Sequence, residues 1–347
     1  MPMADAARSG CSPICSKPAD ISRVADPAGP VAALPRSRLH LQFLLDNAAN
    51  PDVVLFRDEA MRAPLERHFA GRLLYLGRET LPGRSLASFA AARRANRAYY
   101  PAVAARLAPY RFARTILFLE GEPLERFLQT LPGLGAIELW EDGLSHYVDL
   151  TSNRWYAARG VVQAAAGFYP RAITRRRIDR SAVTVRDRFE RRNLVLSAPA
   201  DPSVARAELL LIGSPLVEDR IVSEARFRTA LAEIAAASPC PVRYLPHPRV
   251  DVARLERSLA GTTITLEPNP EGLIAHAAQY RYTAYAAAVS TGLIDLGRYE
   301  RSLFLPGLFG LTRMARVLRG WAANPVGVAD DAGGLRRFVA ALPRDVP

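Results

Sequence analysis

Two short motifs combine residue types that can move a proton and stabilise a departing anion. Trp140-Glu141-Asp142-Gly143 follows one apolar run, and Tyr244-Leu245-Pro246-His247-Pro248-Arg249 follows another. A carboxylate at the end of a buried strand is suited to act as a general base. An imidazole beside an arginine suits a phosphate leaving group. The two motifs therefore predict a group transfer, with Glu141 and His247 as the first candidate catalytic residues.

A third polar motif follows the last clear strand of the chain. Ser290 and Thr291 come directly after the apolar run 285–289, and Gly292 follows them. Two hydroxyl groups and a free backbone amide can hold a phosphate group. At the first motif, Gly143 lets the backbone turn sharply and approach a ligand closely. Together the motifs predict one site for a phosphorylated ligand.

The elements that must position these motifs alternate between strand and helix. Short apolar or β-branched runs predict strands, and stretches with helical periodicity lie between them. The predicted strands are 52–57, 72–76, 115–119, 136–140, 207–213, 242–244, 262–266 and 285–289, and the main predicted helices are 86–107, 123–131, 223–237 and 252–259. This alternation is typical of parallel α/β sheets. Because such sheets bind ligands at the carboxyl ends of their strands, we expect the motifs to meet in a crevice.

The length of the chain favours two domains. It has 347 residues, of which 49% are hydrophobic, and one domain typically takes about 100–200 residues. We predict a disordered tail without an export signal over residues 1–36, a first domain over 37–185 and a second domain over 186–347. An arginine-rich segment between Tyr169 and Asn193 is expected to link the two domains. The predicted fold class is α/β, with two Rossmann-like domains facing each other across a cleft.

The charge of the chain favours an anionic partner without identifying it. The formal net charge is +12 and the sequence pI is about 10.1, although Lys17 is the only lysine. An arginine excess accompanies GC-rich genomes as well as ligand binding, so a solvated basic surface is an equal alternative. No apolar run approaches the ~20 residues of a membrane span. Cys11, Cys15 and Cys240 suit neither a disulfide framework nor a zinc site, which favours a reducing compartment.

The motifs resemble those of a known enzyme family in type and order. Ile137 to Gly143, with Tyr147-Val148-Asp149 behind it, is similar to the acidic motif of bacterial sialyltransferases. Tyr244 to Arg249 resembles their His-Pro motif, and Ser290-Thr291 resembles the hydroxyl motif that follows. Leu211 to Val217 is similar to a segment of the lipooligosaccharide sialyltransferase and polysialyltransferase group. The resemblance covers roughly residues 136–292.

The start of the first domain departs from the family pattern. Members of the family usually open with a clean strand and a Thr-Pro-Leu-Gln-like turn, whereas this chain has only Leu39 to Leu45 after an irregular tail. Either the first strand is degenerate around Val31 to Leu34, or the N-terminal half has diverged. The position of the first strand is therefore left open by the sequence.

The resemblance implies a GT-B glycosyltransferase architecture and an inverting transfer of sialic acid. The donor would be CMP-Neu5Ac, the acceptor a hydroxyl of a bacterial surface glycan such as lipooligosaccharide or capsule, and no cofactor or metal ion would take part. Glu141 would deprotonate the acceptor, Asp142 would orient the substrate, and His247 would stabilise the CMP phosphate as it leaves. The residues assigned to donor binding are Gly213, Pro248, Arg249, Glu267, Ser290 and Thr291.

Two other functions stay open at this point. One is a transferase that uses CMP-Kdo or another nonulosonate, and the other is a non-catalytic protein that binds an anionic ligand or nucleic acid through the arginines of 171–192. Phe189 is the one aromatic residue among those arginines, too few for base stacking, so nucleic acid is not the expected partner.

The location of the protein is also predicted from sequence patterns. Arg313, Arg316 and Arg319 recur every three residues near the C-terminus. Their spacing fits either an interfacial helix on an anionic membrane or a packed terminal helix. We expect a cytoplasmic protein. Peripheral association with the inner face of the cytoplasmic membrane and a homodimer are both compatible with the sequence.

Overall fold

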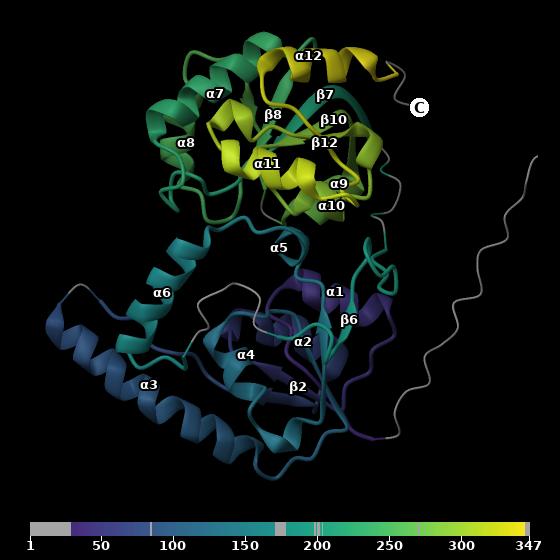
Figure 1. The fold of residues 1–347 in the computed structure, drawn as a ribbon. Coiled ribbons are helices and arrows are strands. Elements are labelled where there is room, and N and C mark those ends of the chain that lie inside the picture. Colours follow the sequence, from purple (N-terminus) through teal and green to yellow (C-terminus); the bar gives the residue numbers. More distant parts are fainter. Residues whose placement is uncertain are drawn as a thin grey trace, which may run out of the picture.

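The protein consists of two α/β domains that lie one above the other (Figure 1). The structure is a computed structural model, and it describes residues 29–343 except residues 84, 171–177, 198, 200, 201, 203 and 270. Each domain contains a six-stranded sheet, and every strand pairing within the two sheets is parallel. The predicted fold class, α/β with two Rossmann-like domains, is confirmed by this topology.

The first sheet has the strand order β3-β2-β1-β4-β5-β6. Its strands are β1 (Val31–Ala33), β2 (Val53–Phe56), β3 (Leu73–Tyr75), β4 (Arg114–Leu117), β5 (Ala136–Trp140) and β6 (Thr184–Arg186). The chain reverses direction across the sheet after β3, where β4 pairs with β1 in register Ala32↔Thr115. In doubly wound sheets this reversal opens a crevice at the carboxyl ends of the central strands. The acidic motif follows β5, one strand beyond this point.

The second sheet repeats the same topology with the order β12-β11-β10-β7-β8-β9. Its strands are β7 (Val204–Ile212), β8 (Val242–Leu245), β9 (Thr265–Leu266), β10 (Tyr280–Ala287), β11 (Ser302–Phe304) and β12 (Gly327–Val328). The His-Pro motif follows β8, and the hydroxyl motif follows β10, so both lie at the carboxyl edge of this sheet. The reversal of strand order falls between β7 and β10, as it does between β1 and β4.

Helices cover both faces of each sheet because the strands carry apolar side chains on both sides. The helices of the first domain are α1 (Arg38–Asp46), α2 (Arg62–Phe69), α3 (Leu86–Leu107), α4 (Pro123–Leu128), α5 (Leu144–Tyr147) and α6 (Asn153–Ala165). In the second domain they are α7 (Glu224–Ala237), α8 (Val252–Leu259), α9 (Leu273–Gln279), α10 (Gly292–Asp295), α11 (Thr312–Gly320) and α12 (Ala332–Ala341). Serine side chains cap several of them, as Ser37, Ser152 and Ser223 do for α1, α6 and α7, which satisfies an amide that the helix leaves free.

The first strand lies inside the range that the sequence predicted to be tail. β1 is a central strand, and Val31 to Leu34 are buried among apolar residues from both faces of the sheet. The prediction of a disordered tail is therefore wrong over residues 29–36, and residues 1–28 lie outside the described residues. A strand of three residues carries too little pattern to be distinguished from an irregular apolar segment.

The predicted boundary between residues 185 and 186 falls inside β6. The first domain extends further, because Leu194 joins its core and the Ser197 amide donates to Asp46 Oδ2 at 2.7 Å. The predicted arginine-rich linker is also partly folded: Arg180 is paired with Glu120, and Arg188 with Glu141. Residues 171–177 of that segment lie outside the described residues.

The two domains are joined by a mixed core. Leu144 and Tyr147 of α5 pack among apolar residues of the second domain, including Leu293. The Tyr147 ring stacks on Trp321, with ring centroids 4.5 Å apart. Trp321 follows α11, whose buried residues Ala315 and Leu318 make it a packed helix and not an exposed interfacial one. Among the described residues, no helix combines the length and apolar character needed to cross a membrane.

Candidate functional site between the domains

The two carboxylates of the acidic motif lie in different surroundings. β5 ends at Trp140, so Glu141 and Asp142 stand at the carboxyl edge of the first sheet. Glu141 has an exposed fraction of 0%. The side chain of Asp142 is 24% exposed. Their side chains diverge because successive residues at the end of a strand point to opposite sides. Gly143 then turns the chain at φ 85° and ψ −149°, a conformation that residues other than glycine rarely adopt.

Glu141 is enclosed in an ion pair that connects the domains. Its carboxylate accepts from Arg188 Nη2 at 2.5 Å and from the Tyr147 hydroxyl at 2.6 Å. Arg188 Nη2 also donates to Asp295 Oδ1 of the second domain at 2.8 Å. Burial raises the pKa of Asp295 to about 7, although the Arg188 guanidinium works to lower it. A substrate hydroxyl has no access to Glu141 in this arrangement, which speaks against the predicted role of Glu141 as base.

Asp142 faces a cavity and is held in place by two donors. Its Oδ1 lies 2.8 Å from His40 Nε2, and its Oδ2 accepts from the Ser145 hydroxyl at 3.0 Å. The Arg36 amide donates to His40 Nδ1 at 3.0 Å, so the proton of a neutral imidazole is on Nε2 and is donated to Asp142. The His40 ring stacks on Phe118 with centroids 4.1 Å apart, which fixes its plane. Asp142 is thus oriented from two sides.

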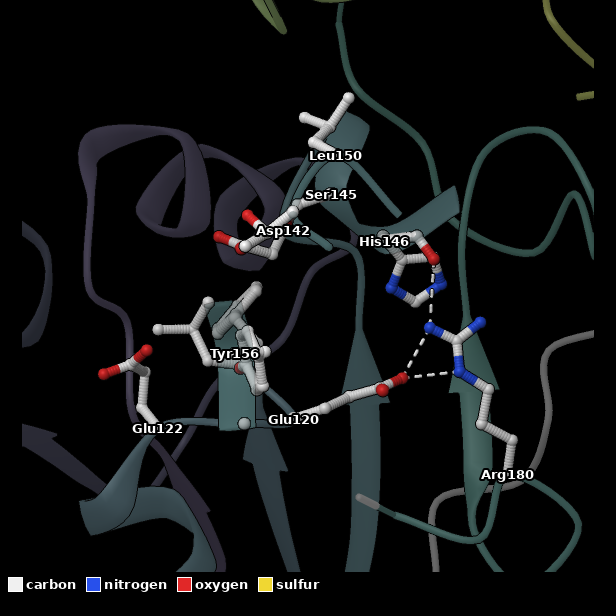
Figure 2. Close-up of a pocket in the computed structure, with 12 residues that line it drawn as sticks. Glu120, Glu122, Asp142, Ser145, His146, Leu150, Tyr156 and Arg180 are labelled. Atoms are coloured by element: carbon white, nitrogen blue, oxygen red, sulfur yellow. Dashed lines mark hydrogen bonds and ion pairs between the residues drawn. The ribbon is translucent and has the colours of Figure 1, made fainter. Parts of the chain in front are cut away.

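The cavity beside Asp142 has an acidic wall, and we call it the acidic cavity. It has a volume of about 230 Å³. Its lining comprises Phe118, Leu119, Glu120, Gly121, Glu122, Asp142, Ser145, His146, Leu150, Thr151, Tyr156 and Arg180. Figure 2 shows Glu120, Glu122 and Asp142 around the Tyr156 ring. Glu120 accepts from Arg180 Nε at 2.5 Å. Carboxylates beside an aromatic ring suit a polyhydroxylated or cationic ligand, because carboxylates accept hydrogen bonds and rings cover apolar faces.

A second cavity lies between the domains, and we call it the arginine cavity. Its volume is about 750 Å³. It is lined by Leu150, Thr151, Ser152, Trp155, Arg159, Asp219, Ile221, Arg249, Gly310, Leu311, Thr312, Arg313 and Met314. Three of these residues are arginines, and Asp219 is the one acidic residue of this lining, where it pairs with Arg249 at 3.0 Å. Leu150 and Thr151 line both cavities, so the acidic and arginine cavities adjoin.

His247 stands next to the arginine cavity without lining it. The Arg249 amide donates to His247 Nδ1 at 3.1 Å, which leaves Nε2 to carry the proton of the neutral ring. Burial and the nearby Arg249 guanidinium lower the pKa of His247, so the ring is neutral at pH 7. Pro248 and Arg249 are exposed, and Asn269 donates to the Pro246 carbonyl at 2.7 Å, which braces the turn. His247 can therefore donate a hydrogen bond through Nε2.

Two residues predicted to bind the donor have internal contacts in the structure. Gly213 packs so closely on β8 that an added Cβ would lie 2.9 Å from the Leu245 carbonyl oxygen and the Tyr244 ring. Glu267 is buried and pairs with Arg206 at 2.9 Å and with Arg243 at 2.8 Å. Neither residue is part of the lining of the two cavities. These contacts support the second sheet.

The hydroxyl motif meets the acidic motif across the domain boundary. The Leu144 amide donates to Thr291 Oγ1 at 3.2 Å, and an added Cβ on Gly143 would overlap Thr291 Cγ2. Ser290 Oγ accepts from the Gly292 amide at 3.1 Å. The structure therefore brings together the first and third motifs, and Thr291 lines neither the acidic nor the arginine cavity.

Sequence patterns missed several residues of the site. His40, Arg159, Arg188 and Asp295 come from segments without a recognisable motif, and Arg313 was identified only as part of an evenly spaced arginine series and not as a site residue. Asp295 follows the hydroxyl motif by four positions, and Arg188 belongs to the arginine-rich segment, so only proximity in sequence could have suggested them. His40 lies about 100 positions from Asp142, a separation at which spacing carries no information.

The comparisons with known proteins are remote. No family model matches the chain, and no curated protein matches it. Among solved structures, the spinosyn rhamnosyltransferase SpnG shares 14% identity, with 90% of both chains covered and a TM-score of 0.44. UGT89C1 of Arabidopsis thaliana, complexed with UDP, shares 10% identity over 92% of this chain and 91% of that chain, with a TM-score of 0.48.

A third similar structure is the UDP-GlcNAc 2-epimerase of Methanocaldococcus jannaschii, in complex with UDP-GlcNAc and UDP. It shares 11% identity over 91% of this chain and 93% of that chain, with a TM-score of 0.48. Likenesses at this level do not decide what this chain binds or transforms. The resemblance of the motifs to those of bacterial sialyltransferases stays a prediction.

Proposed function

We propose that this protein is a glycosyltransferase that moves a sugar from an anionic, nucleotide-activated donor to a hydroxyl group of an acceptor. One observation carries the proposal: an acidic cavity that contains Asp142 adjoins a larger cavity lined by Arg159, Arg249 and Arg313. The two cavities suit substrates of different charge. A neutral, polyhydroxylated acceptor fits the acidic cavity, and a phosphorylated donor fits the arginine cavity.

Asp142 is the base in this proposal, and Glu141 holds the domains together. Asp142 accepts hydrogen bonds from His40 and Ser145 and borders the acidic cavity. It takes the proton of the acceptor hydroxyl as the acceptor oxygen forms its bond to the anomeric carbon. His40 keeps the carboxylate in one orientation, which lowers the entropy cost of the transfer. The role of base, which the motif resemblance implies for Glu141, thus belongs to Asp142 in this proposal.

The donor half of the reaction depends on neutralising the leaving phosphate. The bond between the anomeric carbon and the phosphate oxygen breaks, and the nucleotide leaves with the electron pair. Arginine side chains form charge-assisted hydrogen bonds with phosphate oxygens. His247, whose Nε2 is free to donate, stabilises the charge that develops on the phosphate. Attack from the side opposite the phosphate inverts the anomeric configuration.

The more specific part of the proposal concerns the donor. The order of the acidic, His-Pro and hydroxyl motifs supports CMP-sialic acid, with CMP-Kdo or another nonulosonate as the alternative. In both donors the nucleotide is CMP and the leaving group is a phosphate monoester, so the same protein groups serve either. The acceptor belongs to a bacterial surface glycan such as lipooligosaccharide or capsule, and the transfer proceeds without a metal ion.

Nucleotide binding tests the proposal before any acceptor is known. CMP at about 100 times its Kd is expected to raise the free energy of unfolding by about 2.7 kcal/mol, measured as a thermal shift, whereas UMP and GMP at the same concentration give smaller shifts. Arg249→Ala is expected to reduce the CMP shift. Arg337→Ala on α12, remote from both cavities, is the matched control.

Turnover then distinguishes the donors. We expect CMP release from CMP-Neu5Ac in the presence of galactose-terminated acceptors, and equal rates with and without EDTA. If CMP is released from CMP-Kdo and not from CMP-Neu5Ac, the transferred sugar is Kdo, and the rest of the proposed reaction is unchanged. The absence of a shift with any nucleotide, together with no release from either donor, would remove the glycosyltransferase proposal.

A further inference from the structure

Helix α6 presents an apolar stripe to solvent. Trp155, Ala158, Val162 and Ala165 are spaced so that they lie on one side of the helix, and all four are exposed. The exposed fraction is 66% for Trp155, 57% for Val162 and 71% for the neighbouring Val161. Single exposed apolar residues are common, but a stripe of this kind marks a contact surface.

The stripe belongs to a well-anchored helix. Ser152 caps the start of α6, and Asn96 Nδ2 of α3 donates to the Ala166 carbonyl at its end at 2.9 Å. Gly167 packs so closely on α3 that an added Cβ would lie 2.6 Å from the Arg93 carbonyl oxygen. α6 and α3 lie at the same side of the first domain in Figure 1. The apolar stripe is therefore held in a fixed position beside α3.

The charged residues of α3 and α6 are all positive. The helices α3 and α6 contain no acidic residue, and their arginines are Arg93, Arg94, Arg97, Arg106, Arg154 and Arg159. All six are exposed. Leu86, at the start of α3, is the most exposed large apolar residue among those the structure describes, at 90%. We call the exposed residues of these two helices the α3–α6 surface.

We propose that the α3–α6 surface binds an anionic lipid bilayer. Tryptophan and valine side chains can insert at the level of the lipid headgroups, and the arginine stems extend along them with their guanidinium groups toward lipid phosphates. Each arginine close to an anionic bilayer contributes about 1 kcal/mol to binding. The surface lacks acidic side chains that a bilayer would repel. This surface differs from helix α11, whose apolar face is buried in the core.

The location of the surface fits a membrane-embedded acceptor. Trp155 and Arg159 belong to α6 and also line the arginine cavity. Tyr156 of the same helix lines the adjoining acidic cavity, which the proposed function assigns to the acceptor. A chain bound through α6 would hold both cavities next to the headgroups, where the glycan of a lipid-linked acceptor is located. This consequence rests on the proposed glycosyl transfer, whereas binding to the bilayer does not.

Co-sedimentation with vesicles tests the proposal on the full chain without any substrate. The protein is expected to sediment with phosphatidylcholine vesicles that contain phosphatidylglycerol, to release in high salt, and to stay in solution with phosphatidylcholine alone. Val161→Glu with Val162→Glu should abolish sedimentation. Neither valine lines a cavity. Val252→Glu with Ile274→Glu, at apolar positions on α8 and α9 that are 47% and 48% exposed, is the matched control and should bind as the wild type does.

A charge reversal tests the electrostatic part. Arg93→Glu with Arg97→Glu is expected to weaken partitioning by at least about 30-fold, from two arginines at about 1 kcal/mol each. Arg336→Glu with Arg337→Glu on α12 carries the same charge change and should retain binding. The proposal is overturned if the wild type does not sediment with anionic vesicles. It is also overturned if a double variant on the α3–α6 surface loses no more binding than its matched control. CMP binding is measured on the same variants. If they bind CMP but the wild type does not bind vesicles, the bilayer proposal fails while the proposed function stands.

Discussion

At the scale of single residues, adjacent carboxylates in one motif acquire different chemistry from their surroundings. Glu141 is buried against Arg188 and Tyr147, whereas Asp142 borders a cavity and accepts hydrogen bonds from His40 and Ser145. A buried carboxylate in a bidentate ion pair holds structure, because removal of one partner leaves an uncompensated charge. A carboxylate at a cavity wall can exchange a proton with a ligand.

Amide substitutions separate the two roles. Asp142→Asn can still accept the hydrogen bond from His40 but cannot take a proton, so turnover should fall about 100- to 10,000-fold while the melting temperature is unchanged. Glu141→Gln breaks the pair with Arg188 and should destabilise the fold by about 3–5 kcal/mol. Steady-state kinetics and thermal unfolding of both variants provide the measurement. Normal turnover in Asp142→Asn would contradict its role as base.

At the scale of elements, the turn between β5 and α5 forms the contact between the motifs. Gly143 adopts φ 85° where it meets Thr291, so the turn requires both a positive φ and the absence of a Cβ. The sequence predicted the strand before this turn and the need for glycine, but the predicted neighbour of the Gly143 backbone was a ligand. The structure shows that the neighbour is a threonine of the other domain, which no local pattern could reveal.

Gly143→Ala is expected to lower the free energy of unfolding more than Gly261→Ala does, although both glycines have a similar positive φ. Gly261 has φ 83° and nothing within 4 Å of an added Cβ, so Gly261→Ala reports backbone strain alone, about 1–2 kcal/mol. Gly143→Ala adds the overlap with Thr291, about 1–3 kcal/mol more. Chemical denaturation measures the difference. Thr291→Ser, which removes the overlapping methyl group, should restore part of the loss, and equal losses at both glycines would contradict the contact.

At the scale of the whole molecule, Arg188 joins the domains through one carboxylate from each. Glu141 belongs to the first domain and Asp295 to the second, and the aromatic rings of Tyr147 and Trp321 stack beside them. Two buried carboxylates share one guanidinium, whose single positive charge balances only one of them. Protonation of the other carboxylate removes the remaining negative charge. Burial raises the pKa of Asp295 from 3.8 to about 7, which makes it the group that binds this proton.

The stability of the domain contact should therefore depend on pH. A carboxyl group with a raised pKa stabilises the folded chain while it is protonated, and this contribution is lost as the pH rises through its folded pKa. The loss attributable to Asp295 falls between about pH 4 and pH 7, at up to about 1.4 kcal/mol per pH unit. Asp295→Asn stays neutral, so its melting temperature relative to the wild type should increase from pH 5 to pH 8. If the difference in melting temperature between Asp295→Asn and the wild type does not change with pH, Asp295 is not the group that binds the proton.

The sequence by itself determined the alternating strands and helices and placed the three motifs at strand ends. These features depend on local periodicity and on glycine, proline and serine at turns, which neighbouring residues specify. The sequence indicated the three-residue strand β1 only as one of two alternatives, around Val31 to Leu34, and it misplaced the end of the first domain, because the burial of both depends on neighbours distant in the chain.

Only the tertiary structure decided which side chains face each other. It buried Glu141 against Arg188, set Asp142 beside His40, and placed Arg159 and Arg313 of different domains around one cavity. Burial and opposing charges determine whether a carboxylate is an ion-pair partner or an accessible base. Both are properties of groups brought together by folding, so the motif alone could name the two carboxylates but could not assign their roles.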